Sequence, residues 1–327
     1  MNVVVTGGAG FIGSALIWKL NREGVNNILV VDALGTGDKW KNLVGLRFQD
    51  AMHKDAFLQS IREDTLSFHP DAIVHLGACS ATTERDADYL LENNYRYTRT
   101  LAEWCVQHGT RFVYASSAAT YGDGSDGFSD SDLVTPKLSP LNMYGYSKHL
   151  FDLHALDSGY FDRIAGLKFF NVFGPNEYHK DGMISMVLRS FQQIQETGAV
   201  RLFRSDKPEY PDGGQKRDFV YVKDCVDVLW WLINTPSASG LFNLGTGQAR
   251  TWVDLACAVF QAMGKPSSIQ FIDIPELLKN KYQYFTQADM GKLRLAGYSA
   301  EFLTLEEAVH DYVTNYLSKN RAHLGTA

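Results

Sequence analysis

A glycine-rich turn near the start of the chain limits its possible folds more than any other feature. The turn Gly7–Gly13 directly follows the apolar run Val3–Thr6. It contains Gly-x-Gly-x-x-Gly at Gly8, Gly10 and Gly13. One glycine permits the tight turn, one lets the backbone approach a pyrophosphate, and one lets a helix pack closely on the strand. The helix N-terminus offers free N–H groups and partial positive charge to phosphates. Gly7–Gly13 therefore predicts a dinucleotide-binding turn rather than a purely structural one.

Strands and helices alternate along the first half of the chain. The strands that we predict are Val3–Thr6, Ile28–Asp32, Leu46–Gln49, Ala72–His75, Arg111–Ala115 and Ala165–Phe169. The helices between them are Ile12–Glu23, Lys54–Ser67, Asp88–His108 and Met143–Leu156. This alternation predicts an α/β fold with a doubly wound parallel sheet (the Rossmann type), covered by helices on both faces.

The second half is less regular and predicts a smaller α/β substrate lobe. Its expected elements are helices at Met183–Thr197, Asp224–Asn234 and Trp252–Met263, strands at Arg217–Val222, Leu241–Leu244 and Ile269–Ile272, and two closing helices. Ser205–Gly214 is rich in Pro, Gly and charge, which indicates an exposed loop. We expect the two parts to interleave. Residues 1–172 and 218–248 would form the dinucleotide-binding domain, and residues 173–217 and 249–327 the substrate-binding lobe.

Composition excludes several classes of partner. The formal net charge is -6 and no long basic run occurs, so we expect no nucleic-acid partner. The cysteines (Cys79, Cys105, Cys225 and Cys257) form neither a CxxC pair nor a zinc pattern, so we expect reduced thiols and no metal. We expect no targeting segment, and no apolar stretch reaches the ~20 residues of a membrane span. A cytoplasmic enzyme is the default expectation.

Asp32 ends the second predicted strand, where an acidic residue normally accepts a hydrogen bond from the adenosine ribose. A carboxylate there favours NAD, because it would repel a 2′-phosphate. Lys39 and Lys54 follow and would neutralise such a phosphate if they folded back onto it, although they could equally be solvated lysines. The residues alone leave the choice between NAD and NADP open.

Tyr144 and Lys148 lie four residues apart in a predicted helix, so they share one face. A neighbouring ammonium favours the phenolate, so we expect the pKa of Tyr144 to fall from its ordinary value near ~10. Tyr144 could then take a proton from a substrate hydroxyl as hydride leaves the carbon. Tyr146 is the competing tyrosine, but no lysine follows it at the same spacing. Ser117, preferred over Ser116, ends the fifth strand and would orient the substrate oxygen.

These features resemble the extended short-chain dehydrogenases/reductases that act on nucleotide sugars, and within them the ADP-glycero-manno-heptose 6-epimerase family. The resemblance extends from about residue 2 to about residue 315. It rests on the motifs His75–Glu84, Ala115–Gly122, Phe170–Lys180, Lys216–Val222 and Phe285–Asp289. It implies epimerisation at C6″ of an ADP-bound heptose through a transient ketone, with a tightly held NADP, to supply the lipopolysaccharide inner core. It also implies a homo-oligomer, by resemblance a pentamer.

Inversion through a planar ketone needs proton transfer on two sides of one carbon. The resemblance assigns the second acid/base to Lys180, and the adjacent His179 is its rival. A lysine can serve if desolvation lowers its pKa.

The resemblance implies further contacts. Those to the cofactor are Gly7, Gly10, Phe11, Ile12, Gly13, Asp32, Ala33, Lys39, Lys54, Leu76, Gly77, Ala78, Cys79, Ser80, Asn93, Lys148 and Val172. Those to the substrate are Asn171, Gly182, Arg189, Phe203, Arg204, Ser205, Asp206, Arg217 and Tyr282. Arg217 also makes independent sense, because its guanidinium fork suits a diphosphate. The chain departs from the family pattern at Ala33, Leu76, Gly182 and Arg189, and its 206–215 loop is longer.

Two other functions compete. A nucleotide-sugar 4-epimerase, such as a UDP-hexose 4-epimerase, needs Ser117, Tyr144 and Lys148 but no His-Lys loop. A 4,6-dehydratase normally carries Asp-Glu where this chain has Ala118-Ala119, which disfavours elimination of water. A non-enzymatic dinucleotide sensor is expected to lose the catalytic tyrosine, which is present here. Because one fold hosts all of these functions, the site residues must separate them.

Overall fold

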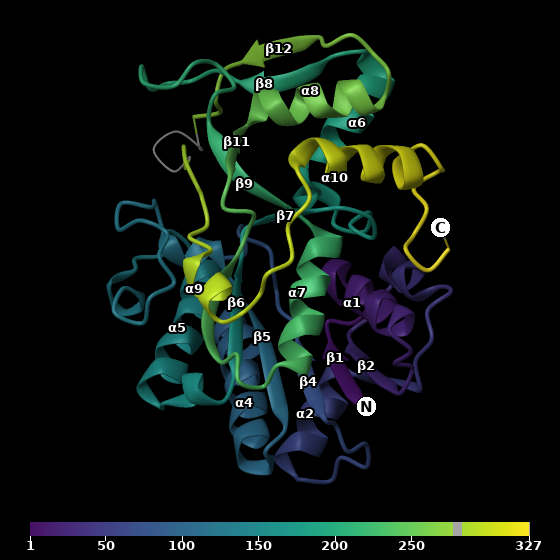
Figure 1. Cartoon of the computed structure of the whole chain (residues 1–327), viewed down its shortest axis with the longest axis vertical. Helices are drawn as coiled ribbons and strands as arrows, with labels where there is room; N and C mark the ends of the chain where they lie inside the picture. The colour runs from purple at the N-terminus through teal and green to yellow at the C-terminus, as the bar shows by residue number, and fades with distance from the viewer. Residues whose placement is uncertain (277–282, 327) are drawn as a thin grey trace.

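A seven-stranded parallel sheet forms the base of the fold (Figure 1). The structure is a computed structural model and describes residues 1–276 and 283–326. The strand order is β10-β6-β5-β4-β1-β2-β3. The bounds are β1 Val3–Thr6, β2 Ile28–Asp32, β3 Asp50–His53, β4 Ala72–His75, β5 Arg111–Ser117, β6 Ala165–Phe169 and β10 Gly240–Leu244. This order and its parallel pairings confirm the predicted doubly wound α/β topology.

Helices cover both faces of this sheet, which explains why its central strands are apolar on both sides. Val3 and Val5 of β1 face α1 (Phe11–Arg22) and α7 (Val222–Asn234). Val4 faces the opposite layer, which is formed by three helices. These are α2 Lys54–Arg62, α4 Tyr97–His108 and α5 Met143–Asp157. Side chains alternate between the faces of a strand, so both layers bury apolar surface against β1.

The second lobe consists of two small sheets and their helices. One sheet has the order β11-β9-β7, and in the other β12 pairs with β8. The strands are β7 Asn171–Phe173, β8 Val200–Phe203, β9 Lys216–Tyr221, β11 Ala249–Thr251 and β12 Ile269–Ile272. The helices of this lobe are α6 Met186–Thr197, α8 Trp252–Ala262 and α10 Leu305–Tyr312, whereas α9 Gly291–Leu295 packs against β10 of the large sheet (Figure 1). In Figure 1, β8, β12, α6 and α8 lie at the end of the molecule away from the large sheet.

Shorter helical segments connect these elements. They are η1 Asp38–Leu43, α3 Ala87–Leu90, η2 Leu91–Arg96, η3 Ala118–Tyr121, η4 Thr135–Lys137, η5 Tyr160–Asp162, η6 Asp181–Met183 and η7 Val313–Leu317. Two of them, η2 and η7, are π-helical. Within the described residues, none of the helices combines the length and apolar character that crossing a bilayer requires.

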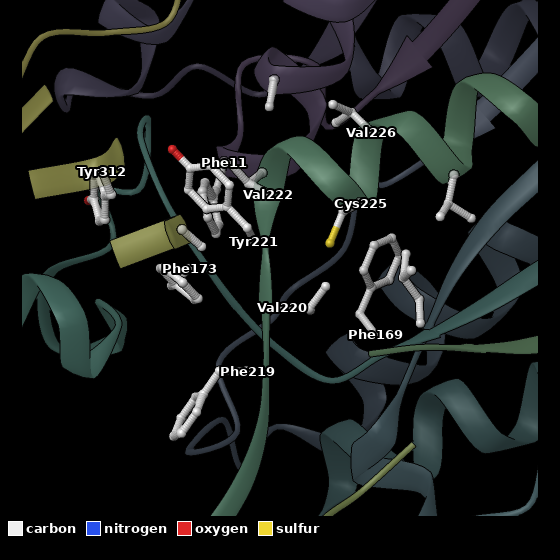
Figure 2. Close-up of a cluster of buried hydrophobic side chains, with 14 of the residues drawn as sticks. Phe11, Phe169, Phe173, Phe219, Val220, Tyr221, Val222, Cys225, Val226 and Tyr312 are labelled. Atoms are coloured by element: carbon white, nitrogen blue, oxygen red, sulfur yellow. The ribbon is translucent and has the colours of Figure 1, made fainter. Parts of the chain in front are cut away.

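One hydrophobic core extends from the large sheet into the second lobe. Figure 2 shows Phe169 of β6 near Cys225 and Val226 of α7, and Phe173 and Tyr312 beyond the end of β9. The chain therefore crosses between the lobes inside a shared core rather than through a linker.

Several predicted elements need correction. The third strand is Asp50–His53 and not Leu46–Gln49. The helix predicted at Lys54–Ser67 ends at Arg62, and the long helix at Asp88–His108 is divided into α3, η2 and α4. Three short strands, β7, β8 and β11, had no counterpart in the prediction.

Candidate active site

The glycine turn is packed so tightly that side chains would not fit. A Cβ atom on Gly13 would lie 2.1 Å from the carbonyl oxygen of Gly7, and one on Gly7 would lie 2.7 Å from the backbone nitrogen of Gly77. Gly7 also has a φ of +65°, a conformation that glycine adopts without strain. Gly10 caps α1 without any side-chain hydrogen bond, so the first N–H groups of the helix remain available. The turn therefore fits a pyrophosphate.

A cavity of about 570 Å³ opens beside this turn at the carboxyl ends of the strands. It gathers most of the residues assigned to the cofactor from sequence. Those that line it are Gly7, Gly10, Phe11, Ile12, Gly13, Asp32, Ala33, Lys39, Lys54, Leu76, Gly77, Ala78, Cys79, Ser80 and Asn93. Lys148 and Val172 do not line the cavity. Lys148 Nζ nevertheless donates a 2.8 Å hydrogen bond to the carbonyl of Ala115, and Ala115 is a lining residue.

Asp32 joins the glycine turn to the segment that carries Lys39. Its carboxylate accepts hydrogen bonds from the backbone N–H of Ala9 at 2.9 Å and of Ala33 at 2.7 Å. Lys39 Nζ lies 2.6 Å from Asp32 Oδ1, and Lys54 Nζ donates to Asn93 Oδ1 at 3.0 Å. Two ammonium groups therefore stand at the end of the cavity where an adenosine ribose would bind.

Tyr144 and Lys148 start α5, and their electrostatics differ from the prediction. Burial raises the pKa of Tyr144, a hydrogen bond from Ser117 opposes this rise, and the Cys79 thiol adds to it. The predicted lowering of the Tyr144 pKa by the Lys148 ammonium is wrong. Lys148 is buried, and burial lowers its own pKa to about 8. Its Nζ donates to the backbone carbonyl of Ala115. Because burial raises the pKa of Tyr144, this side chain stays a neutral phenol, hydrogen-bonded to Ser117.

The alternatives to Ser117 and Tyr144 are Ser116, which bonds to another residue, and Tyr146, which is exposed. Ser116 Oγ donates to Asp152 Oδ2 at 2.7 Å, and Tyr114 donates to the other oxygen of the same carboxylate. Tyr146 is 45% exposed. Ser117, by contrast, accepts a hydrogen bond from Ala119 N and contacts Tyr144. The geometry therefore favours Ser117 with Tyr144.

Lys180 lines the same cavity as the glycine turn. Its ammonium lies 5.1 Å from the centre of the Phe11 ring. Burial lowers its pKa, and the charge of Glu177 opposes the shift. Glu177 is itself buried, and it accepts hydrogen bonds from Ser185 Oγ at 2.7 Å and Tyr312 OH at 3.1 Å, which fix the loop. His179 also lines the cavity, and burial lowers its pKa.

The described residues assigned to substrate lie outside the cavity lining. Arg189 Nη2 donates to the carbonyl of Gly182 at 3.1 Å, which brings these two together. Asn171 begins β7 and pairs with Phe219 of β9, the strand that also carries Arg217.

Three further residues assigned to substrate, Arg204, Ser205 and Asp206, follow β8. Arg204 pairs with Asp212 and Asp273, Ser205 N donates to Asp212, and Asp206 bonds to Tyr284. Phe203 ends β8, and Tyr282 lies outside the described residues.

Comparison with known proteins identifies the family. The model of the NAD dependent epimerase/dehydratase family matches residues 3–245. The chain belongs to this family. It is an epimerase, hence an isomerase, and its cofactor is a nicotinamide dinucleotide.

Three similar proteins illustrate the likeness. The ADP-L-glycero-D-manno-heptose-6-epimerase of Nitratidesulfovibrio vulgaris (Hildenborough strain) is 58% identical over 321 residues, covering 98% of this chain and 99% of that protein. The crystal structure of the enzyme with the same name from Helicobacter pylori has a TM-score of 0.79 at 27% identity, covering 96% of this chain and 95% of that one. The Thermus thermophilus UDP-glucose 4-epimerase in complex with NAD has a TM-score of 0.73 at 26% identity, covering 96% and 98%.

Sequence reasoning missed several residues of this epimerase's cavity. They are Thr6, Val31, His75, Ala81, Tyr89, Tyr97, Ala115 and Met183. His75 is held between Thr6 Oγ1 at 2.6 Å and Thr98 Oγ1 at 2.9 Å. Its place at the end of a predicted strand could have revealed it, because ligands bind there in doubly wound sheets. Tyr89 and Met183 had no such signal.

Proposed function

We propose that this epimerase inverts C6″ of ADP-D-glycero-D-manno-heptose to give the L-glycero epimer, through a transient 6″-ketone. The observation that carries the proposal is the position of Lys180, a desolvated lysine in the cavity of the dinucleotide turn. Tyr144 belongs to α5 and Lys180 to the loop after β7, so the two proposed acid/base groups are carried by different elements. The name of the 58% identical relative supports the same substrate.

The chemistry of the two side chains is complementary. A nicotinamide dinucleotide held at the glycine turn would supply the hydride acceptor for C6″ and the hydride donor for the other face of the ketone. In the first half-reaction one side chain takes the proton of the C6″ hydroxyl, and in the second the other gives a proton to the ketone oxygen. A neutral lysine can take a proton and a neutral tyrosine can give one. One proton then passes from lysine to tyrosine before the next turnover, and no net oxidation results.

The remaining site assignments form part of the proposal. Asn171, Arg189 and Arg217 would hold the ADP-heptose together with Gly182, Phe203–Asp206 and Tyr282. Arg217 donates to the backbone carbonyls of Lys216 and Gln283, and its planar fork could exchange these partners for diphosphate oxygens. Lys148 would contact the nicotinamide ribose, and Val172 would also contact the cofactor. Residues 1–172 and 218–248 would serve the dinucleotide, and residues 173–217 and 249–327 the sugar.

We propose NADP as the physiological cofactor, with NAD as the alternative. Lys39 and Lys54 support it, because both line the cavity near Asp32 and would neutralise a 2′-phosphate. Releasing the bound cofactor from purified protein and assaying it for a 2′-phosphate tests the choice. A cofactor without that phosphate would contradict it.

The assembly and location of the enzyme are also proposals. We propose a homo-oligomer, by resemblance a pentamer, which light scattering on purified protein would detect. The four cysteines are free, which suits the reducing cytoplasm where we propose the enzyme works.

A direct assay tests the function. Purified protein is incubated with ADP-D-glycero-D-manno-heptose, and the epimers are separated by chromatography. We expect a mixture of both epimers without added cofactor. If the heptose is unchanged while UDP-glucose is converted to UDP-galactose, the enzyme is a 4-epimerase and the proposal is wrong.

A further inference from the structure

The C-terminal tail, residues 322–326, lies across the loop that leads to Lys180. Tyr178 OH donates to the carbonyl of Ala322 at 3.0 Å, and the His323 ring lies edge-on to the Tyr178 ring with centroids 5.1 Å apart. The backbone N–H of Leu324 donates to Asn176 Oδ1 at 3.0 Å. The tail also packs on the segment after η1, where a Cβ on Gly45 would meet the carbonyl of Gly325 at 2.2 Å. Residues 322–326 are therefore anchored both to the loop that leads to Lys180 and to the segment after η1.

Asn42 connects this tail to both parts of the active site. Its Nδ2 donates to the carbonyl of Ala9, in the glycine turn, at 2.9 Å, and contacts His179 Nδ1 at 3.1 Å. Its Oδ1 lies 2.9 Å from His323 Nδ1. An amide has two N–H donors and one acceptor oxygen, so His179 must accept at Nδ1 and His323 must donate from Nδ1. Asn42 is 1% exposed, and all its hydrogen-bonding groups are satisfied.

A second asparagine, Asn176, also connects the tail to the glycine turn. Asn176 is fully buried and has a φ of +77°, a conformation that asparagine tolerates better than most residues. Its Oδ1 accepts from Leu324 N, and its Nδ2 donates to Ser14 Oγ at 2.9 Å. Ser14 Oγ in turn donates to the carbonyl of Gly10 at 2.7 Å. The two sets of hydrogen bonds therefore both join the tail to the glycine turn. The first runs through Asn42, which contacts His179 of the Lys180 loop, and the second runs through Asn176 of that loop.

We propose that the tail acts as a strap that fixes Lys180 relative to the bound dinucleotide, with Asn42, Asn176 and His323 as positioning residues. The role of Lys180 rests on the proposed function. An acid/base group works only within hydrogen-bond reach of its proton, and small displacements of a reacting group are costly. His179 serves as part of this strap rather than as the acid, because its Nδ1 must stay unprotonated to accept from Asn42.

Matched variants of His323 test the strap. His323→Leu removes the donor to Asn42, His323→Asn can restore an N–H at a similar place, and His310→Leu changes an exposed histidine on α10 as a control. We expect His323→Leu to lower kcat by about tenfold or more and to raise the Kd for NADP several-fold. The substrate KM should stay within about twofold, because Arg189 bonds to Gly182 and Asn171 pairs with Phe219 rather than with the tail. His323→Asn should recover most of both losses, and His310→Leu should behave as wild type.

The outcomes separate the two proposals. Wild-type kcat and cofactor affinity in His323→Leu would overturn the strap. Equal losses in His323→Leu and His323→Asn would also overturn it, because the hydrogen bond would then be irrelevant. The cofactor titration needs no sugar. If wild-type protein fails to epimerise the heptose while His323→Leu still weakens cofactor binding and His323→Asn restores it, the proposed function fails and the strap stands. If His323→Leu does not fold, Asn42→Ser provides the same readouts, with the same losses expected.

Discussion

Tyr144 and Lys180 are both desolvated, but burial acts on them in opposite directions. Burial favours the neutral form of each group, so it raises the pKa of the phenol and lowers the pKa of the amine. The result is a neutral acid and an amine that loses its proton more readily than a solvated lysine. Two titratable groups with such environments form a complementary acid–base pair.

Lys180→Arg tests the second acid/base. A guanidinium keeps the positive charge but is not deprotonated in proteins, so it cannot act as a base. We expect kcat to fall by roughly 10²–10⁴-fold with the cofactor still bound. Lys265→Arg, at an exposed lysine, should retain wild-type turnover. Unchanged turnover in Lys180→Arg would move the second role to another group.

The pH dependence of wild-type turnover follows from the same residue. Lys180 acts as a base only when neutral, and its lowered pKa brings that form to lower pH than the ordinary 10.5. We expect kcat to rise with pH along a limb whose midpoint lies below 10.5. The limb should be absent in Lys180→Arg, as steady-state rates across pH would reveal. A limb that persists in this variant belongs to a different residue.

Tyr144→Phe has a matched control in Tyr146→Phe. Both changes remove one hydroxyl from α5, but only Tyr144 is hydrogen-bonded to Ser117. We expect Tyr144→Phe to lower kcat by roughly 10²–10⁴-fold and Tyr146→Phe to leave it near wild type. Single-turnover reduction of the cofactor would locate the loss at hydride transfer. The reverse ranking of the two variants would refute the assignment.

His75 predicts how stability depends on pH. Burial, with the charge of Lys148, lowers its pKa from 6.5 to about 3. Between these values the unfolded chain binds a proton that the folded chain does not, so the free energy of unfolding falls as pH falls. His75→Gln removes this effect. Between pH 6.5 and about pH 5, denaturant unfolding should show wild type losing about 2 kcal/mol relative to the variant. Parallel pH curves would contradict a buried neutral His75.

At the scale of elements, the glycine turn depends on close packing rather than on composition. A Cβ on Gly13 would collide with backbone, whereas one on Gly37 would meet open space. We expect Gly13→Ala to raise the Kd for the dinucleotide more than about tenfold, because the turn must open to accept the methyl group. Gly37→Ala, close to the same site, should bind normally. Equal affinities, measured by fluorescence titration with the reduced cofactor, would rule out this account of the turn.

The accuracy of the sequence predictions followed burial. β1, β2, β4 and β6 have their predicted bounds, because central strands covered on both faces must be apolar. β3 was misplaced because it is an edge strand, paired only with β2, and its residues Asp50–His53 are mostly exposed. The sequence signal instead favoured the more apolar Leu46–Gln49. The strands β7 and β11 are too short, at three residues each, to establish a period.

The π-helical segment η2 also lay beyond prediction, although it positions site residues. It carries Asn93, which bonds to Lys54, and Asn94, which donates to the carbonyl of Cys79 at 3.0 Å. π-helical segments often occur at functional sites, but no simple residue pattern marks them. The strap formed by Asn42 and His323 was hidden for another reason. Its parts are 281 residues apart, and no local motif links them.

At the scale of the whole molecule, the shared core explains how distant segments build one site. β6, β9, α7 and α10 contribute to one continuous cluster (Figure 2), which fixes the lobe that carries Lys180 against the sheet that carries the glycine turn. The cofactor turn therefore indicates only that a dinucleotide binds. The second lobe carries Lys180, the group that we propose distinguishes this epimerase from a simple dehydrogenase.

We propose that the hydride leaves C6″ and returns to the same carbon. The most direct test uses ADP-D-glycero-D-manno-heptose that carries deuterium at C6″, with the product examined by NMR and mass spectrometry. We predict an L-glycero product that keeps the deuterium at C6″, without accumulation of reduced cofactor. Loss of the label to solvent, or a stoichiometric build-up of reduced cofactor and keto-sugar, would contradict the account.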